Sequence, residues 1–208
     1  MATGRLTRDE QRARTRERLI ASARTVFARR GFHRASLEEI GDEAGYSTGA
    51  VYSNFEGKED LFLAVLEEHV VARARAVEEA VARGATEQDR IRAGGDDWMR
   101  FLREDPDWYP LFIEFWAYAM RDPDLREQVA ERFAVILDAN TDRVRDAAAE
   151  LGIELPPEAA RTGGVLVTAL ADGLALIKLL NPDAVPDALL GDVLSVLPAL
   201  GRHVAGDA

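Results

Sequence analysis

The stretch "SLEEIGDEAGYSTGAVYSNFEGK", Ser36–Lys58, decides the fold class of this chain. Ser36 and Glu39 have the three-residue spacing of a capping box, which predicts the start of a short helix. Gly45 then supplies the left-handed backbone that a sharp turn needs. A second short helix is expected over roughly Ser47–Phe55. Together these elements predict a helix-turn-helix motif.

The second helix of this motif has a composition that a helix built only for a core would not have. In a helix-turn-helix the second helix enters the major groove of DNA. Small side chains at its start let the backbone approach DNA, and the free amides there favour phosphate. A threonine near the start can bond a base edge, and the tyrosine, asparagine and lysine that follow can donate to phosphates. The residues concerned are Ser47, Thr48, Gly49, Tyr52, Asn54 and Lys58.

Two of these residues have an alternative, purely structural interpretation. Tyr52 would then pack against the first helix of the chain, and Lys58 would be a solvated residue at the start of the next helix.

Helical periodicity extends from this motif through almost the whole chain, and no segment shows sustained two-residue alternation. About nine helices are expected, covering approximately residues 7–31, 36–44, 47–55, 58–83, 87–104, the segment that reaches 120, 123–151, 157–180 and 188–204. The sequence therefore predicts an all-α protein.

The charge distribution bears on nucleic-acid binding. The 208 residues carry a net charge of −11, which at first argues against a phosphate backbone as partner. However, residues 1–34 hold ten arginines against three acidic residues, whereas residues 59–208 carry a net charge of −14. Exposed charges more than about 10 Å apart hardly interact at physiological salt, so a local basic patch can act on an acidic protein. An arginine-rich, solvated helix is the alternative.

Several classes of protein are excluded by composition and motifs. The absence of cysteine excludes disulfides and thiolate metal sites. The three histidines lie far apart without metal-ligand spacing, and no nucleophile, phosphate-loop or dinucleotide motif occurs, so we expect no enzyme, cofactor or metal. The longest apolar run, Val165–Leu180, carries Asp172 and Lys178 and is too short to span a membrane. We expect a soluble, cytoplasmic protein.

The sequence "TRERLIASARTVFARRGFHRASLEEIGDEAGYSTGAVYSNFEGKEDLFLAVLEEH", Thr15–His69, resembles the N-terminal domain of TetR-family transcriptional regulators. The similarity covers about a quarter of the chain without gaps. It implies an all-α homodimer in which residues 1–58 form a three-helix DNA-binding head. Residues 59–208 would form a ligand-sensing, dimerising body of roughly six helices. The segment "FIEFWAYAMRDPDL" is similar, more weakly, to the body of regulators related to the BetI repressors, within an AcrR- and BetI-like group.

The resemblance also implies which residues touch DNA. It places phosphates at Thr15, Ser36, Tyr52, Asn54 and Lys58, and bases at Ser47, Thr48, Gly49 and Ser53. Many relatives carry histidine where Asn54 stands, and larger side chains where Thr48 or Ser53 stands. Direct base readout is therefore expected to be sparse, with DNA shape and water contributing to specificity.

Eight of the fifteen aromatic residues of the chain lie within residues 98–118. Such a cluster is typical of a small-molecule pocket, although any single ring of it is more often simply part of the core. The candidate pocket residues are His69, Trp98, Phe101, Trp108, Phe112, Phe115 and Trp116. Among them in sequence, Glu114 could face a cationic ligand, pair with Arg121 or lie in water.

The helix expected over 157–180 contains three glycines, Gly163, Gly164 and Gly173, each costing about 1 kcal/mol relative to alanine. Close helix–helix approach would compensate that cost. In the family, this helix and the last one form a four-helix bundle with a partner subunit. The candidate dimer-interface residues are Val165, Ala169, Gly173, Ile177, Leu189, Val193 and Leu197.

The function expected from these features is ligand-responsive regulation of transcription. The hypothesis is a repressor that binds a palindromic double-stranded operator as a homodimer and is released by an unknown small-molecule effector. The alternative is a helical interaction or small-molecule-binding protein without sequence-specific DNA binding.

Overall fold

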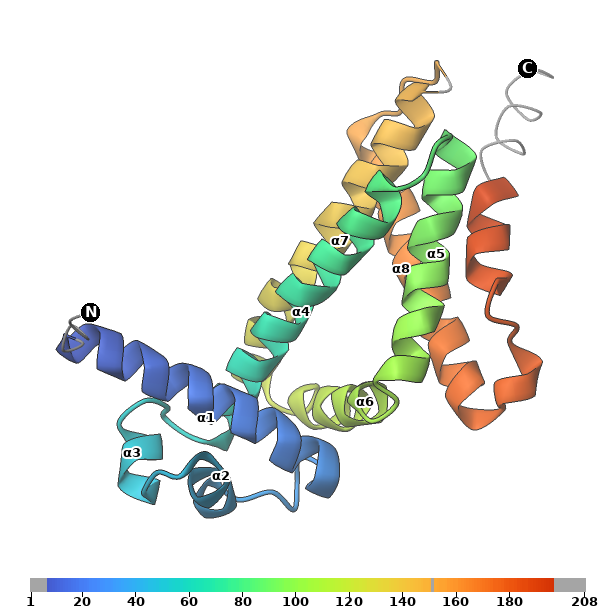
Figure 1. Ribbon diagram of the computed structural model, residues 1–208. Coiled ribbons are helices and arrows are strands. Elements are labelled where there is room, and N and C mark those ends of the chain that lie inside the picture. Colours follow the sequence, from blue (N-terminus) through green and yellow to red (C-terminus); the bar gives the residue numbers. More distant parts are fainter. Residues whose placement is uncertain (1–6, 151, 197–208) are drawn as a thin grey trace, which may run out of the picture. The chain divides into compact units, whose positions relative to one another are not determined.

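The computed structural model describes residues 7–150 and 152–196, and in this part of the chain every regular element is helical (Figure 1). The all-α prediction is therefore confirmed. The elements are α1 (Arg8–Arg30), α2 (Leu37–Ala44), α3 (Thr48–Tyr52), α4 (Lys58–Ala82), α5 (Glu87–Glu104), α6 (Trp108–Ala119), α7 (Pro123–Glu150), α8 (Pro157–Leu180), the 3-10 turn η1 (Pro182–Ala184) and a final helical stretch over 189–196.

The helix ends of the head form where the capping residues predict. Thr7 caps α1 in a complete capping box with Glu10. Ser36 caps α2 by accepting from the backbone N–H of Glu39, and Gly45 ends α2 in the left-handed conformation, with φ of 73°. These local signals suffice because each one satisfies a backbone group that a helix end leaves unpaired.

Two helix boundaries differ from the sequence prediction. α3 ends at Tyr52 rather than Phe55, because the Ser53 hydroxyl and the Asn54 amide both donate to the Ala50 carbonyl, at 2.8 Å each. Side chains that bond nearby backbone in this way compete with helix continuation. α6 starts at Trp108, inside the break predicted over 105–110, since a proline is tolerated in the first turn of a helix.

The chain divides into two compact units. Unit 1 contains the described residues up to His69 together with Pro110–Ala130, and unit 2 contains Val70–Tyr109 and the described residues from Glu131 onward. The helices α4, α6 and α7 each contribute residues to both units.

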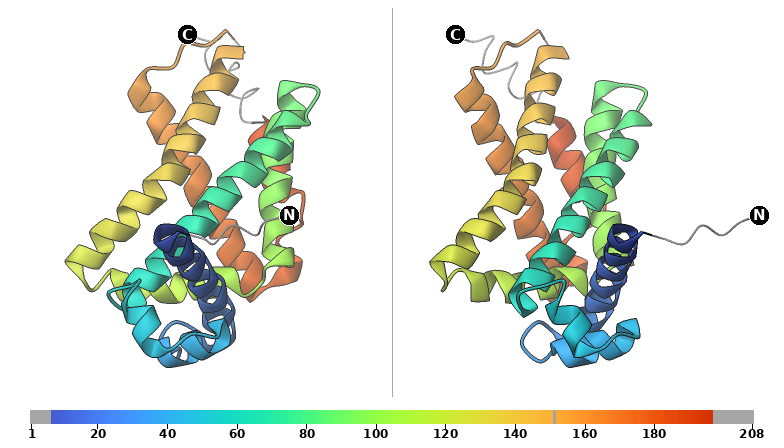
Figure 2. Two further views of the ribbon diagram at one scale, coloured as in Figure 1. Left: turned by 60° about the vertical axis from the view of Figure 1, so that its left-hand side comes forward. Right: turned by 90° about the vertical axis from the view of Figure 1, so that its left-hand side faces the viewer.

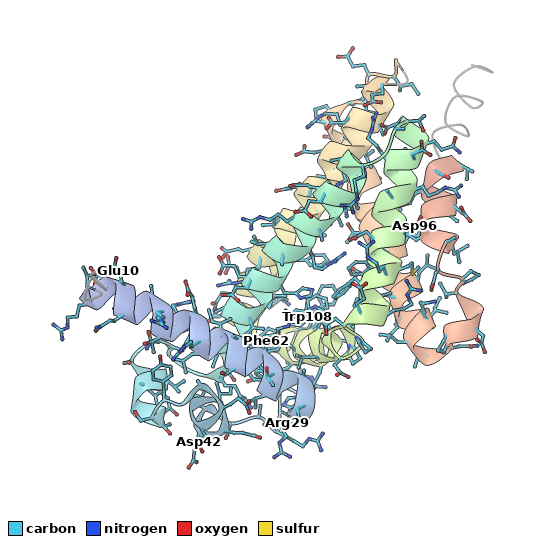
Figure 3. The ribbon with its side chains drawn as sticks, in the orientation of Figure 1. Glu10, Arg29, Asp42, Phe62, Asp96 and Trp108 are labelled. Atoms are coloured by element: carbon cyan, nitrogen blue, oxygen red, sulfur yellow. The ribbon has the colours of Figure 1, made fainter. Side chains whose placement is uncertain are left out.

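Unit 1 holds α1, α2 and α3, with α2 and α3 on one side of α1 (Figure 1). Its core is an aromatic cluster in which Phe62 of α4 contacts rings from α1 and α6 (Figure 3). The Phe62 ring stacks on Phe115 at 4.0 Å between centroids, and Phe32 lies edge-on to both. Ring pairs of this geometry add to the stabilisation from burial alone. The C-terminal part of α6 is thus built into the same core as the predicted DNA-binding helices.

Unit 2 is held together by close helix contacts at glycines. α7 and α8 cross (Figure 2), and a Cβ on Gly164 would lie 2.8 Å from the backbone nitrogen of Thr141. A Cβ on Gly163 would lie 2.7 Å from the Val144 side chain, and one on Gly95 of α5 would lie 2.5 Å from the backbone of Gly191. The close approach expected at Gly163 and Gly164 is confirmed, and its partner is α7 of the same chain.

A buried ion pair also joins α4 to α5 within unit 2. The Asp97 side chain is fully buried and accepts from Arg73 at 2.6 Å and from Arg100. The guanidinium of Arg73 also lies 4.4 Å from the centroid of the Phe101 ring. Burial and the neighbouring Arg100 lower the pKa of Arg73 to about 10, which leaves it charged at neutral pH.

Candidate functional site

The exposed face of α3 and its N-terminal cap is the candidate nucleic-acid interface. The Ser47 side chain caps α3 by accepting from the backbone N–H of Ala50. Ser47 and Gly49 are exposed and Thr48 is half-buried, so the first turn of α3 presents small side chains to solvent. Val51 is fully buried beneath them and fixes which face of the helix points outward.

Tyr52 extends the same face as a large exposed ring. Its exposed fraction is 61%, so the alternative in which Tyr52 packs against the first helix is wrong. An exposed aromatic side chain with a donor at its tip, next to small polar residues, suits contact with a polar partner such as a phosphate backbone.

The residues that follow Tyr52 are partly committed to local structure. Asn54 uses its amide nitrogen on the Ala50 carbonyl and on Ser53 Oγ at 3.3 Å, while its Oδ1 is buried without a partner in the described structure. Ser53 is exposed, and its hydroxyl donates to Ala50. Both side chains therefore support the end of α3 as well as facing the candidate interface.

Two arginines beside Asn54 were not singled out from the sequence. Asp9, Arg12, Ala13, Arg16 and Asn54 line an open groove of about 300 Å³. Arg12 donates to the Ser53 carbonyl at 3.4 Å, and the Arg16 guanidinium lies 4.8 Å from the centroid of the Phe55 ring. The arginine-rich α1 is therefore next to α3, which explains how an acidic protein can present local positive charge. The arginine count gave the signal, but only the fold selects these two.

Thr15 and Ser36, predicted to hold phosphates, both have structural partners. Ser36 is the exposed cap of α2. The Thr15 hydroxyl donates to the Gln11 carbonyl at 2.9 Å and also bonds the Tyr46 hydroxyl. Hydrogen bonds with Thr15 and Arg18 of α1 lower the pKa of Tyr46. Tyr46 thereby connects α1 to the turn before α3.

Lys58 is engaged more deeply than a residue at a solvated helix start would be. Its Nζ donates to the carbonyls of His33 and Ala35, both at 3.1 Å, and lies 4.7 Å from the Phe32 ring centroid. An ammonium has three donors, so these contacts leave one N–H for another partner. Its predicted role as a phosphate contact stays a prediction.

The candidate pocket residues are divided between the two units. His69, Phe112, Phe115 and Trp116 belong to unit 1, whereas Trp98, Phe101 and Trp108 belong to unit 2. All are buried except Trp98 and Trp116, which are half-buried. Phe115 is fully buried in the aromatic core of unit 1, which agrees with the alternative that individual rings belong to the core.

In unit 2, Asp172 of α8 bonds Tyr109, whose ring contacts Trp98. The Tyr109 hydroxyl donates to the Asp172 carbonyl at 3.0 Å and to its Oδ1 at 3.2 Å, and the Trp98 indole donates to the carbonyl of Ala171. Burial raises the pKa of Asp172 to about 6, although the Tyr109 hydrogen bond opposes that shift. Burial also raises the pKa of Tyr109 well above its usual range.

The structure gives Glu114 partners that the sequence did not suggest. Its carboxylate accepts hydrogen bonds from the backbone N–H groups of Phe32 and His33, at 3.1 and 3.0 Å. The sequence signal was its position as the only charged residue of α6. The partners lie more than eighty residues away, so no local pattern could identify them.

The candidate dimer face on α8 is exposed and apolar. Leu166, Ile177 and Leu180 have exposed fractions of 64%, 48% and 80%. Of the candidate residues, Val165, Ala169 and Ile177 are exposed, and Gly173, Leu189 and Val193 are half-buried. Leu197 lies outside the described residues. A Cβ added to Gly173 would meet nothing within 4 Å, unlike one added to Gly163 or Gly164.

By length and composition alone, α8 could cross a membrane, and only 17% of its most apolar stretch is buried. The sequence prediction considered only the apolar run Val165–Leu180, whereas the whole helix Pro157–Leu180, whose bounds agree with the predicted ones, is long enough. In the described part of the chain, no group of three or more histidine, cysteine or acidic residues could hold a metal ion.

The fold and the α3 face define a helix-turn-helix protein with a large helical body. The family model for tetR-family bacterial regulatory proteins matches residues 19–65, and that for the C-terminal part of BetI-type transcriptional repressors matches residues 87–197. The chain belongs to the TetR family of transcriptional regulators and has a BetI-type C-terminal domain, which confirms the resemblance. This is a family of regulators and not of enzymes.

Curated relatives include both a transcriptional activator and a transcriptional repressor. The chain is 35% identical over 142 residues to the transcriptional activator FasR of Mycolicibacterium smegmatis, covering 68% of this chain but only 60% of FasR. It is 30% identical over 137 residues to a transcriptional repressor of Mycobacterium tuberculosis, covering 66% of this chain and 68% of that protein.

Among solved structures, the fold is similar to that of FadR from Bacillus subtilis in complex with stearoyl-CoA. The TM-score is 0.68 at 19% identity, over 88% of this chain and 96% of that one. At this identity the likeness concerns the fold alone.

Proposed function

We propose that this protein represses transcription as a homodimer that binds a palindromic operator and is released by a small molecule. The observation that carries the proposal is the outward face of α3, where Ser47, Thr48 and Gly49 precede the exposed Tyr52. That face is polar, small at its start and fixed by the buried Val51, which suits a helix inserted in a major groove.

Roles on DNA follow from position on this face. Ser47, Thr48, Gly49 and Ser53 would meet base edges, whereas Thr15, Ser36, Tyr52, Asn54 and Lys58 would meet phosphates. The local arginines of α1 would add attraction for the backbone despite the acidic total charge. The same proposal places the boundary between a DNA-binding head and a ligand-sensing body near residue 58.

Dimerisation through α8 is supported by its exposed apolar side chains and by Gly173. A glycine in a helix costs about 1 kcal/mol, and the described residues around Gly173 offer no packing reason for it. A second copy of α8 lying against it would supply that reason and cover the apolar face. Two-fold pairing would then set two α3 helices about 34 Å apart, the distance of one DNA turn.

In the proposed dimer, a second copy of α8 rather than a membrane covers the apolar face of this helix. We therefore infer a cytoplasmic protein. The effector would bind in the body, near aromatic residues of unit 2 such as the half-buried Trp98. It would weaken operator binding by favouring a conformation with lower affinity for DNA. FadR holds stearoyl-CoA in its crystal structure, but fold likeness alone supports no ligand class for this chain.

The test is selection of bound fragments from a random-sequence DNA library, using protein refolded from denaturant to remove any bound ligand. The wild type should enrich an inverted repeat, and Tyr52→Ala should enrich nothing at the same salt concentration. Tyr52→Phe, which keeps the ring and loses only the hydroxyl, is the matched variant. If the refolded wild type enriches no sequence, operator binding by this chain is refuted.

A further inference from the structure

The turn between α1 and α2, residues 31–35, is held by side chains from two other helices of unit 1. α1 ends at Gly31, whose N–H bonds the Phe27 carbonyl. The next two N–H groups, of Phe32 and His33, donate to the Glu114 carboxylate of α6, at 3.1 Å to Oε2 and 3.0 Å to Oε1. Each carboxylate oxygen thus receives one backbone donor, and hydrogen bonds to an ionised acceptor are the stronger kind.

The carbonyl groups of the same turn are held from α4. Lys58 Nζ donates to His33 and Ala35, and its charge lies over the Phe32 ring. The turn therefore has its donors bound to an anion on α6 and its acceptors bound to a cation on α4. A backbone segment satisfied in this way by side chains has its geometry set by the helices that carry them.

The fit between the turn and Glu114 is close. A Cβ on Gly31 would lie 2.7 Å from Glu114 Oε2, and Gly31 has a φ of 75°, which disfavours any other residue. The Phe32 side chain, only 1% exposed, is packed against Phe62 and Phe115. The position of the turn is consequently fixed against α6 by both polar and apolar contacts.

The turn leads directly into Ser36, the cap of α2, and α2 carries α3 through the Gly45 turn. We propose that Glu114 is a positioning residue for DNA binding. It acts by holding the turn so that α2 and α3 keep the orientation to α1 that operator recognition requires. This inference rests on the proposed function, because it concerns the operator-binding face, but Glu114 itself makes no contact with DNA.

The decisive variant is Glu114→Gln, which has the same shape. Its amide oxygen can accept from one N–H, but its NH₂ group faces the other donor, so the paired contact is lost. Glu114→Ala removes both acceptors. Operator Kd should rise about tenfold for the glutamine variant and at least as much for the alanine variant. The slope of log Kd against log salt should stay unchanged, because no phosphate contact is removed.

Tyr118→Phe is the matched control. Tyr118 lies one turn further along α6, and its hydroxyl donates to Glu59 of α4 at 3.0 Å rather than to the turn. The control should leave operator Kd within about twofold of wild type. Hydrogen exchange supplies the second measurement, since the Phe32 and His33 amides should exchange at least about tenfold faster in Glu114→Gln and unchanged in Tyr118→Phe.

A role confined to stability would lower the melting temperature without changing the Kd of the folded protein. A Glu114→Gln variant that exposes the two amides but binds the operator within twofold of wild type would therefore overturn the inference, as would amides that stay protected. If the wild type selects no operator at all, the proposed function fails instead, and the two failures are distinguishable.

Discussion

Helices α3 and α8 each have an exposed face, and the two faces differ in the chemistry of their side chains. α3 presents small polar side chains and Tyr52, above a fully buried Val51. α8 presents leucines, valine and isoleucine, above Gly163 and Gly164 packed tightly on α7. The contrast teaches that the chemistry of an exposed face, and not exposure itself, suggests the partner: DNA for the polar face of α3 and, in the proposed dimer, a second copy of the chain for the apolar face of α8.

The largest expected effect is the loss of the proposed dimer when the apolar face of α8 is changed. Ile177→Glu places a charge on the exposed apolar face. In a dimer that charge would be buried without a partner, at a cost of several kcal/mol. Sedimentation velocity should report a dimer for wild type and a monomer for the variant at micromolar concentration, with operator affinity reduced by about a hundredfold or more.

Tyr52→Ala is the reciprocal control for that experiment. It should abolish operator binding while leaving the sedimentation coefficient of the dimer unchanged. A dimer that persists in Ile177→Glu would remove α8 from the interface.

The second prediction separates the two faces of α8 by glycine substitution. Gly164→Ala should lower the free energy of unfolding by about 1–3 kcal/mol, because the new methyl group meets the Thr141 backbone. The Gly173→Ala methyl group meets no atom within 4 Å in residues 7–150 and 152–196. The variant should not destabilise a monomer, since alanine is favoured in a helix. It should instead weaken dimerisation, measured as a concentration-dependent melting temperature. Equal unfolding effects at the two positions would contradict the assignment of faces.

These glycines also illustrate which features of the structure can be predicted from the sequence and which cannot. Caps such as Ser36 and Gly45 were predictable because each acts on backbone within a few residues. The three glycines of α8 look alike in sequence, yet two face α7 and one faces open space, a difference set by packing. The partners of Glu114 and Lys58, and the groove beside Arg12 and Arg16, likewise depend on which distant segments the fold brings together.

The third prediction concerns Asp172, a charged group on α8. Burial raises its pKa to about 6, above the value of about 4 expected in the unfolded chain. The folded state therefore binds the proton more tightly between pH 4 and 6, and stability falls as pH rises through that window. Asp172→Asn keeps an acceptor for Tyr109 and removes the charge. It should raise the free energy of unfolding by about 1–2 kcal/mol at pH 7.5.

At pH 4 the same variant should differ little from wild type, because Asp172 is then protonated in the folded state and already about half protonated in the unfolded chain. Thermal denaturation at the two pH values measures this difference. A stabilisation of the same size at both would show that the charge of Asp172 is not its cause.

The smallest expected effect concerns DNA binding, through the contribution of Lys58 to affinity and its salt dependence. Lys58→Ala should weaken binding to all DNA sequences alike and reduce the salt slope by about one unit, if its remaining N–H meets a phosphate. Fluorescence anisotropy at several salt concentrations measures the slope. Thr48→Ala is the comparison, since it should change sequence preference while leaving the slope alone. A Lys58→Ala slope equal to that of wild type would restrict Lys58 to bracing the α1–α2 turn.

The most direct test of the central claim, that two copies joined through α8 place two α3 faces on one operator, is the mass of the protein–DNA complex. Native mass spectrometry with the selected duplex should give two chains per palindrome, and a duplex cut to one half-site should bind about a hundredfold or more weaker. A single chain bound to the half-site duplex, with an affinity equal to that for the full palindrome, would contradict the account.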